Sequence, residues 1–107
     1  MRHYRQGDVL IVTVGSIPQG TQPVARDRGR IVLAYGEATG HAHAIHDRNA
    51  TLSTITGDEV DDRFLEITGA AASLVHEEHD TITLPPGAYR VRRQREYTPE
   101  APVMVAD

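Results

Sequence analysis

The fold is decided first by an unbroken run of apolar and β-branched residues, Val9-Leu10-Ile11-Val12-Thr13-Val14. A run of this length that follows turn residues such as Gly7-Asp8 is typical of a buried β-strand. Working outward, the same alternation of short strand and turn residues recurs along the chain. Further strands are predicted at 30–35, 41–46, 51–56, 63–68 and 88–97.

The segment 70–79 is ambiguous between helix and strand. Its alanines favour a helix by propensity, whereas Leu74-Val75 and the hairpin-like spacing around them favour a strand, which we prefer. Seven or eight short strands without a long amphipathic helix predict an all-β fold, either a small β-barrel or a sandwich. A surface loop is expected at 15–29 and an irregular tail from residue 98, with 103–105 as a candidate edge strand.

Composition limits the class of protein. The 107 residues fit a single domain, 1–107, and the absence of cysteine excludes disulfides and thiolate metal sites. Eleven basic residues, all of them arginine, against fifteen acidic ones give a net charge of −4, which makes nucleic acid an unlikely partner. No apolar stretch reaches membrane-spanning length, so we expect a soluble, cytoplasmic protein.

Histidine is unevenly distributed along the chain. Five of the six histidines stand in two short tracts, His41-Ala42-His43-Ala44-Ile45-His46 and His76-Glu77-Glu78-His79. Neutral imidazole is the commonest protein ligand for transition metals, and carboxylates lie beside both tracts. We predict that the fold brings together four metal ligands: His41, His43, His76 and His79.

The first tract suits a metal site if it is a strand. Side chains on a strand alternate between faces, so His41 and His43 point the same way. His46 has the opposite parity and joins them only if the strand turns near Ile45. Its participation stays open, as does that of Glu37 as an oxygen ligand or a hydrogen-bond acceptor.

The second tract has two histidines three residues apart. On a helix His76 and His79 share a face, whereas on a strand they do so only with a bend or bulge. The spacing is one residue short of the helical zincin motif. Glu77 or Glu78 is the candidate general base beside a metal-bound water, or a ligand. Histidine and carboxylate ligands fit several metals; zinc is our nominal choice, with iron, nickel or manganese as alternatives.

Four arginines occupy the last strand: Arg90, Arg92, Arg93 and Arg95. Alternation places Arg93 and Arg95 on the face of the tyrosines, where they are candidates to bind an anionic substrate or to pair with the Glu77-Glu78 region. The simpler interpretation, which we favour, is a solvated strand that neutralises nearby acids.

Four segments together resemble a group of small uncharacterised bacterial and phage proteins: residues 6–10, 36–43, 74–79 and 84–100. The resemblance covers nearly the whole chain and implies that both histidine tracts belong to one recurring pattern, with no assigned activity. More loosely, 36–43 and Pro86-Gly87 are similar to the two motifs of cupins, small β-barrels that hold a metal with a His-x-His pair. The later cupin histidine is replaced by Arg90, so a cupin-like site would need His76 or His79 instead.

Two classes of function remain. The first is a small metal-dependent enzyme, for which hydrolysis by a metal-activated water is the most economical reaction, since no organic cofactor motif is visible. The second is a non-catalytic accessory module of a bacterial or phage system that binds a partner protein, with a structural metal or none. Exposed strand edges also make a homodimer an expected arrangement. A catalytic site keeps an open ligand position, whereas a structural site is closed and its loss unfolds the chain.

Overall fold

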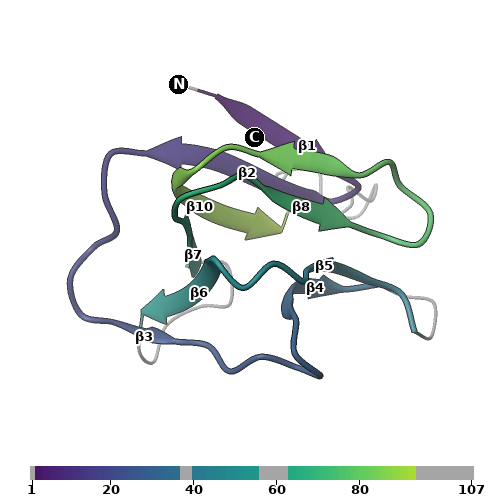
Figure 1. The fold of residues 1–107 in the computed structure, drawn as a ribbon, viewed down its shortest axis with the longest axis horizontal. Helices are drawn as coiled ribbons and strands as arrows, with labels where there is room; N and C mark the ends of the chain where they lie inside the picture. Colours follow the sequence, from purple (N-terminus) through teal and green to yellow (C-terminus); the bar gives the residue numbers. More distant parts are fainter. Residues whose placement is uncertain (1, 37–39, 56–62, 94–107) are drawn as a thin grey trace, which may run out of the picture.

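Two antiparallel sheets make up the computed structural model, which describes residues 2–36, 40–55 and 63–93 (Figure 1). The six-stranded sheet has the order β1(His3–Gln6), β2(Val9–Val14), β10(Gly87–Arg93), β7(Arg63–Ile67), β6(Ala50–Ile55) and β3(Thr21–Pro23). The four-stranded sheet has the order β4(Ile31–Tyr35), β5(Ala42–Ile45), β8(Ala72–Val75) and β9(Ile82–Leu84). The described residues contain no helix, so the all-β prediction is confirmed.

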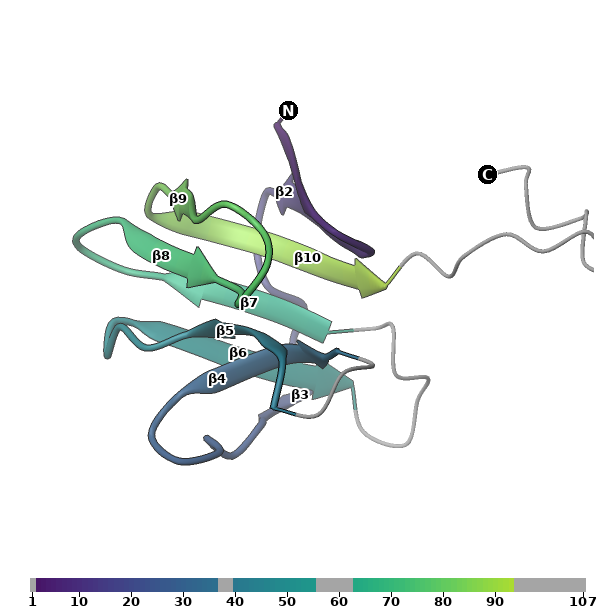
Figure 2. The same cartoon turned by 90° about the vertical axis from the view of Figure 1, so that its right-hand side faces the viewer.

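Both sheets contribute to one hydrophobic core, and Figure 2 shows them from the side. The run 9–14 behaves as its pattern predicts, because Val9 and Ile11 are buried in the core while Leu10 lies on the opposite face. The four-stranded sheet supplies Leu33 and Leu74, both fully buried. Removing such side chains from water is the main source of stability in a domain of this size. In the order of the described strands, neither sheet closes on itself.

Three short strands were not predicted: β1, β3 and β9. The expected loop 15–29 contains β3, which pairs with β6 through Thr21 and Ile55. These three strands are short, and their sequences show no run or alternation of apolar residues long enough to predict a strand. The ambiguous segment 70–79 is a strand over Ala72–Val75, followed by bends at 77–79. The predicted tail from residue 98 and the candidate strand at 103–105 lie outside the described residues.

The connection between β1 and β2 is a two-residue turn, Gly7-Asp8, closed by the pairing of Gln6 with Val9. Gly7 has a φ of +60°, a left-handed conformation that glycine adopts without steric cost. On the other side of β2, Arg93 of β10 pairs with Val9 and so lies beside this turn. No helix in the described residues is long and apolar enough to cross a membrane.

Candidate metal centre

The register between β5 and β8 brings the two histidine tracts together. Ala44 pairs with Val75 and Ile45 with Leu74, so each step back along β5 is matched by a step forward beyond β8. Continuing this register places His43 opposite His76, residue 42 opposite 77, and residue 41 opposite 78. Because β8 ends at Val75 and the chain bends at 77–79, His76 and His79 are not held to opposite faces of a strand.

This arrangement brings four histidine rings into one cluster, in which each ring contacts at least one other. The ring centroids of His43 and His76 are 4.3 Å apart, and those of His76 and His79 are 4.6 Å apart. The His41 ring stands edge-on to His76 at 5.6 Å, and His79 stacks on His43 at 5.8 Å. These are the four histidines that the sequence proposes as ligands, and His76 touches the other three. Their metal-binding role stays a prediction.

His43 is the buried member of this group, with 3 % of its surface exposed. Its Nδ1 lies 2.8 Å from Oε1 of Gln6, another buried side chain. The Gln6 amide has a defined orientation because its Nε2 donates to the carbonyl oxygens of Leu74 and Asp80, each at 3.0 Å. Oε1 is therefore the acceptor, Nδ1 of His43 carries the proton, and Nε2 of the neutral ring keeps its lone pair.

The surroundings of His43 hold the ring in its neutral form. The pKa of His43 is lowered to about 4, mainly by burial and also by the nearby His76 and His79, while Asp8 opposes the change. Metal ions bind the neutral imidazole, so this ring needs no deprotonation at neutral pH.

Asp8 faces the free side of the His43 ring. Its Oδ1 is 3.6 Å from Nε2 of His43, and its Oδ2 accepts a hydrogen bond of 2.8 Å from Nε of Arg93. Burial raises the pKa of Asp8, but the hydrogen bond and positive charge of Arg93 outweigh it and lower the pKa below 3.8. Asp8 is accordingly ionised at neutral pH.

Gly7 lies against the histidines. A Cβ at this position would be 2.8 Å from Nε2 of His79 and 3.1 Å from Cε1 of His43. Glycine is therefore required at position 7 for two reasons: the backbone has a positive φ, and the imidazoles occupy the space where a Cβ would lie.

The loop after β8 supplies two carboxylates. Oε1 of Glu77 accepts a hydrogen bond of 2.9 Å from the backbone N–H of Ala42, which, with the N–H of Glu77 itself, lowers the pKa of Glu77. Oε2 of Glu78 is 3.7 Å from Nδ1 of His41. The backbone N–H of Glu78 donates to Nδ1 of His76 at 3.0 Å, so in the neutral His76 ring the proton is on Nε2.

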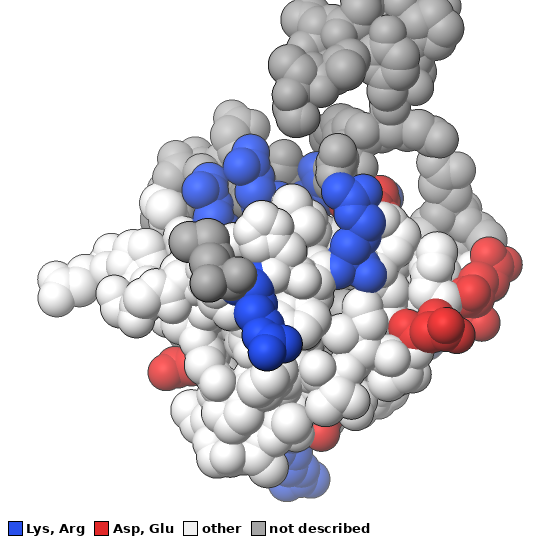
Figure 3. All heavy atoms as spheres, turned by 90° about the horizontal axis from the view of Figure 1, so that it is seen from above, with Lys and Arg blue, Asp and Glu red and all other residues white. Residues whose placement is uncertain are grey.

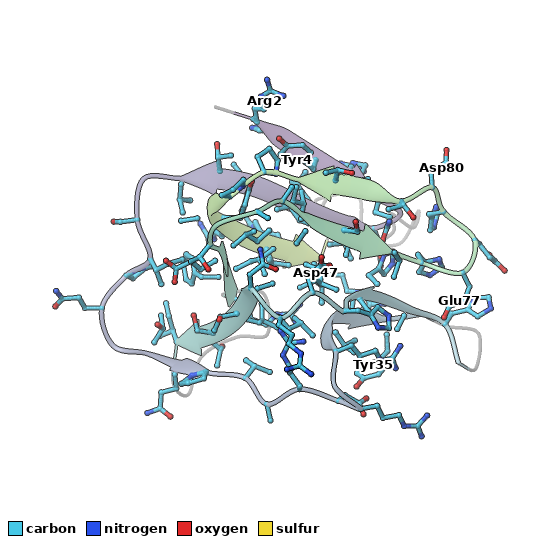
Figure 4. The ribbon with its side chains drawn as sticks, in the orientation of Figure 1. Arg2, Tyr4, Tyr35, Asp47, Glu77 and Asp80 are labelled. Atoms are coloured by element: carbon cyan, nitrogen blue, oxygen red, sulfur yellow. The ribbon has the colours of Figure 1, made fainter. Side chains whose placement is uncertain are left out.

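Among the described residues, one group of three side chains brings its possible ligand atoms close enough together to hold a metal ion. His41, His76 and Glu77 each offer a ligand atom, and the three atoms lie within 4.8 Å of one another. Glu77 is labelled in Figure 4, in the same loop as Asp80. In Figure 3 the largest group of acidic side chains lies at the right-hand edge, single acidic side chains lie elsewhere, and arginines lie mainly across the upper and central part of the face.

The other residues singled out by the sequence lie elsewhere. Arg93 pairs with Asp8 rather than with Glu77-Glu78, because the pairing of β10 with β2 places it beside the turn. His46 is exposed and, among the described residues, takes no part in the ring contacts. Arg95 and Glu37 lie outside the described residues.

Sequence reasoning overlooked Gln6 and Asp8 as partners of His43. Both flank a glycine at a turn. A signal was present, since 6–10 is one of the segments that carry the resemblance to the small bacterial and phage proteins. Its link to the histidines is a contact across 37 residues of chain, which no local pattern contains.

Comparison with known proteins identifies one family. A family model described as a domain of unknown function, DUF8820, matches residues 5–94. This range includes both histidine tracts and the turn at Gly7-Asp8. No curated protein and no solved structure matches the chain.

Proposed function

The chain belongs to the domain of unknown function family DUF8820, and from the geometry of its own residues we propose that it binds a divalent transition metal. The ligand group is His41, His76 and Glu77, and zinc is the nominal ion. The supporting observation is that ligand atoms from these three side chains lie within 4.8 Å of one another. Two imidazoles and one carboxylate form a ligand set of catalytic zinc, and also of non-haem iron.

Only a small movement separates this group from a bound geometry. Ligand atoms about 2.1 Å from a tetrahedral zinc ion are roughly 3.4 Å from one another. The required contraction is therefore about 1.4 Å or less, which rotation of the exposed Glu77 side chain and of the half-buried His41 and His76 rings provides. Glu77 is exposed and ionised, and while one of its oxygens accepts the Ala42 N–H, the other is available to the ion.

His76 imposes one condition on metal binding. Its Nδ1 accepts the Glu78 N–H, so ligation through Nε2 requires the ring proton to move to Nδ1 and this hydrogen bond to break. The loss costs about 1 kcal/mol. An ion bound through Nδ1 displaces the same N–H at a similar cost. Binding is therefore coupled to a change in the loop 76–79.

Three protein ligands leave a tetrahedral ion with one position for water, which supports a hydrolytic reaction. A zinc ion lowers the pKa of its bound water to about 7 and so supplies hydroxide at neutral pH. Glu78 is the base we assign, because its carboxylate is exposed and reaches the ligand His41 at 3.7 Å. Glu77, the other candidate from the sequence, is used as a ligand.

Calorimetric titration of chelator-treated protein with Zn²⁺ tests the ligand group. We expect Glu77→Gln to weaken binding at least about tenfold, since it removes a charged ligand. Glu66→Gln is the matched control, because Glu66 is an exposed glutamate on β7. Equal affinity of the Glu77→Gln variant and the parent would overturn the assignment. Elemental analysis of a His43→Ala, His76→Ala double variant adds an independent check, with metal expected only in the parent.

A further inference from the structure

We propose a second metal position in this domain, between Nε2 of His43 and Oδ1 of Asp8. The two atoms are 3.6 Å apart and belong to different elements, the strand β5 and the turn after β1. The ion is a divalent transition metal, because the donors are one imidazole nitrogen and one carboxylate oxygen. The position uses none of the ligands of the proposed function, and does not rest on it.

Both atoms at this position are hydrogen-bond acceptors. Nδ1 of His43 donates its proton to the Gln6 amide oxygen, so Nε2 is the ring nitrogen that is left to bind an ion. Oδ2 of Asp8 accepts the hydrogen bond from Arg93, which leaves Oδ1 turned toward that nitrogen. A nitrogen and a carboxylate oxygen thus face each other with room for a cation between them.

The separation of the two atoms fits an ion better than a water molecule. For ligand distances of about 2.1 Å, a spacing of 3.6 Å subtends roughly 118° at the ion, close to the tetrahedral angle. A water that donates to both atoms over about 2.8 Å would have an angle of roughly 80° between its hydrogen bonds. That is well below the angle between the two O–H bonds of water.

Each of the two ligand side chains is oriented by a hydrogen bond on the side away from the proposed ion, as is common for metal ligands. Gln6 holds the His43 ring through Nδ1, and the Gln6 amide is in turn held by two backbone carbonyls. Arg93 holds the far oxygen of Asp8 at 2.8 Å. Hydrogen bonds of this kind set the tautomer of a ligating histidine and orient a ligating carboxylate.

His79 is the candidate third ligand of this position, and the exposed part of Asp8 gives the ion access from solvent. The imidazole of His79 stacks on His43, and its Nε2 borders the space that Gly7 leaves free. Because His79 is exposed, its ring turns toward the ion without disturbing the core. The Asp8 side chain is 37 % exposed, so the ion enters from the surface and keeps water as its remaining ligand.

Counting bound zinc tests this position. The protein is prepared in a His3→Gln, His46→Gln background, which removes two exposed histidines, then stripped with chelator and dialysed against Zn²⁺. We expect about two ions per chain in this parent and about one in the Asp8→Asn variant. Asp80→Asn is the matched control, since the backbone carbonyl of Asp80, and not its side chain, accepts the Gln6 hydrogen bond.

The outcomes separate this proposal from the proposed function. A zinc count in the Asp8→Asn variant equal to that of the parent would overturn the second position, whether the parent binds one ion or two. A Glu77→Gln variant that still binds two ions would instead overturn the His41, His76 and Glu77 group. If Asp8→Asn does not fold, ¹¹³Cd NMR of a His41→Ala, Glu77→Gln variant decides, since it lacks two ligands of the other group. One resonance is expected from the second position, and the absence of any resonance would contradict the proposal.

Discussion

Gln6 and His43 are joined by a buried hydrogen bond of 2.8 Å in which Nδ1 of the imidazole donates to the amide oxygen. The same amide donates to the carbonyls of Leu74 and Asp80, so Gln6 connects β1 to β5, to β8 and to the loop that follows β8. One side chain therefore ties together the three segments that surround the histidine rings.

Replacement of Gln6 by leucine is expected to lower the free energy of unfolding by about 3 kcal/mol, because three hydrogen bonds are lost and buried polar atoms remain. Urea denaturation measures the change. Gln22→Leu is the control, since Gln22 is exposed on β3 and its replacement should change stability by no more than about 0.5 kcal/mol. Equal stability of the two variants would show that the Gln6 bonds contribute nothing.

Gly7→Ala is expected to destabilise the protein more than Gly20→Ala does. Both glycines have positive φ, at +60° and +87°, and each alanine costs about 1 kcal/mol for that reason. Only at Gly7 does the added Cβ also meet a side chain, at 2.8 Å from His79. In a His79→Ala background the excess penalty at Gly7 should become smaller in thermal unfolding, because only the 3.1 Å contact with Cε1 of His43 remains. An excess that is unchanged there would exclude His79 as its cause.

Because the His43 ring is buried in its neutral form, we expect the free energy of unfolding of the metal-free protein to fall as the pH falls from about 6.5 to about 4. The pKa of His43 is about 4 in the folded state against an ordinary 6.5, so in this window the unfolded chain binds more protons. The contribution is complete above 6.5. His43→Gln should flatten the dependence of melting temperature on pH in this range, and His46→Gln, at an exposed position, should leave it unchanged. The Asp8 contribution is separable, since its pKa is lowered from 3.8 and it is lost only at lower pH.

Arg93→Gln is expected to raise the pKa of Asp8. Burial raises this pKa, and the hydrogen bond and charge of Arg93 are the largest of the effects that lower it. Carbon-detected NMR titration of the Asp8 carboxyl reads the value directly. The pair is about one-third exposed, so the loss of stability should be only about 0.2–1 kcal/mol. Arg92→Gln, on the same strand with its side chain exposed, is the control; an equal shift in that variant would mean that the contact with Arg93 is not the cause.

The sequence by itself determined seven of the ten described strands and the positions of the two histidine tracts. Strands such as Val9–Val14 are visible because their side chains alternate against one core, a periodicity that local sequence carries. The shorter strands, such as Thr21–Pro23, form only because a longer neighbour offers its edge, and they have no pattern of their own.

Only the tertiary structure decided which residues surround the histidines. The β5–β8 register places His43 opposite His76, and the β1–β2 turn brings Gln6 and Asp8 to the same ring. These are contacts between segments far apart in the chain, and they depend on the order of strands in the sheets. A single sequence specifies that order through the packing of the whole core rather than through any local signal.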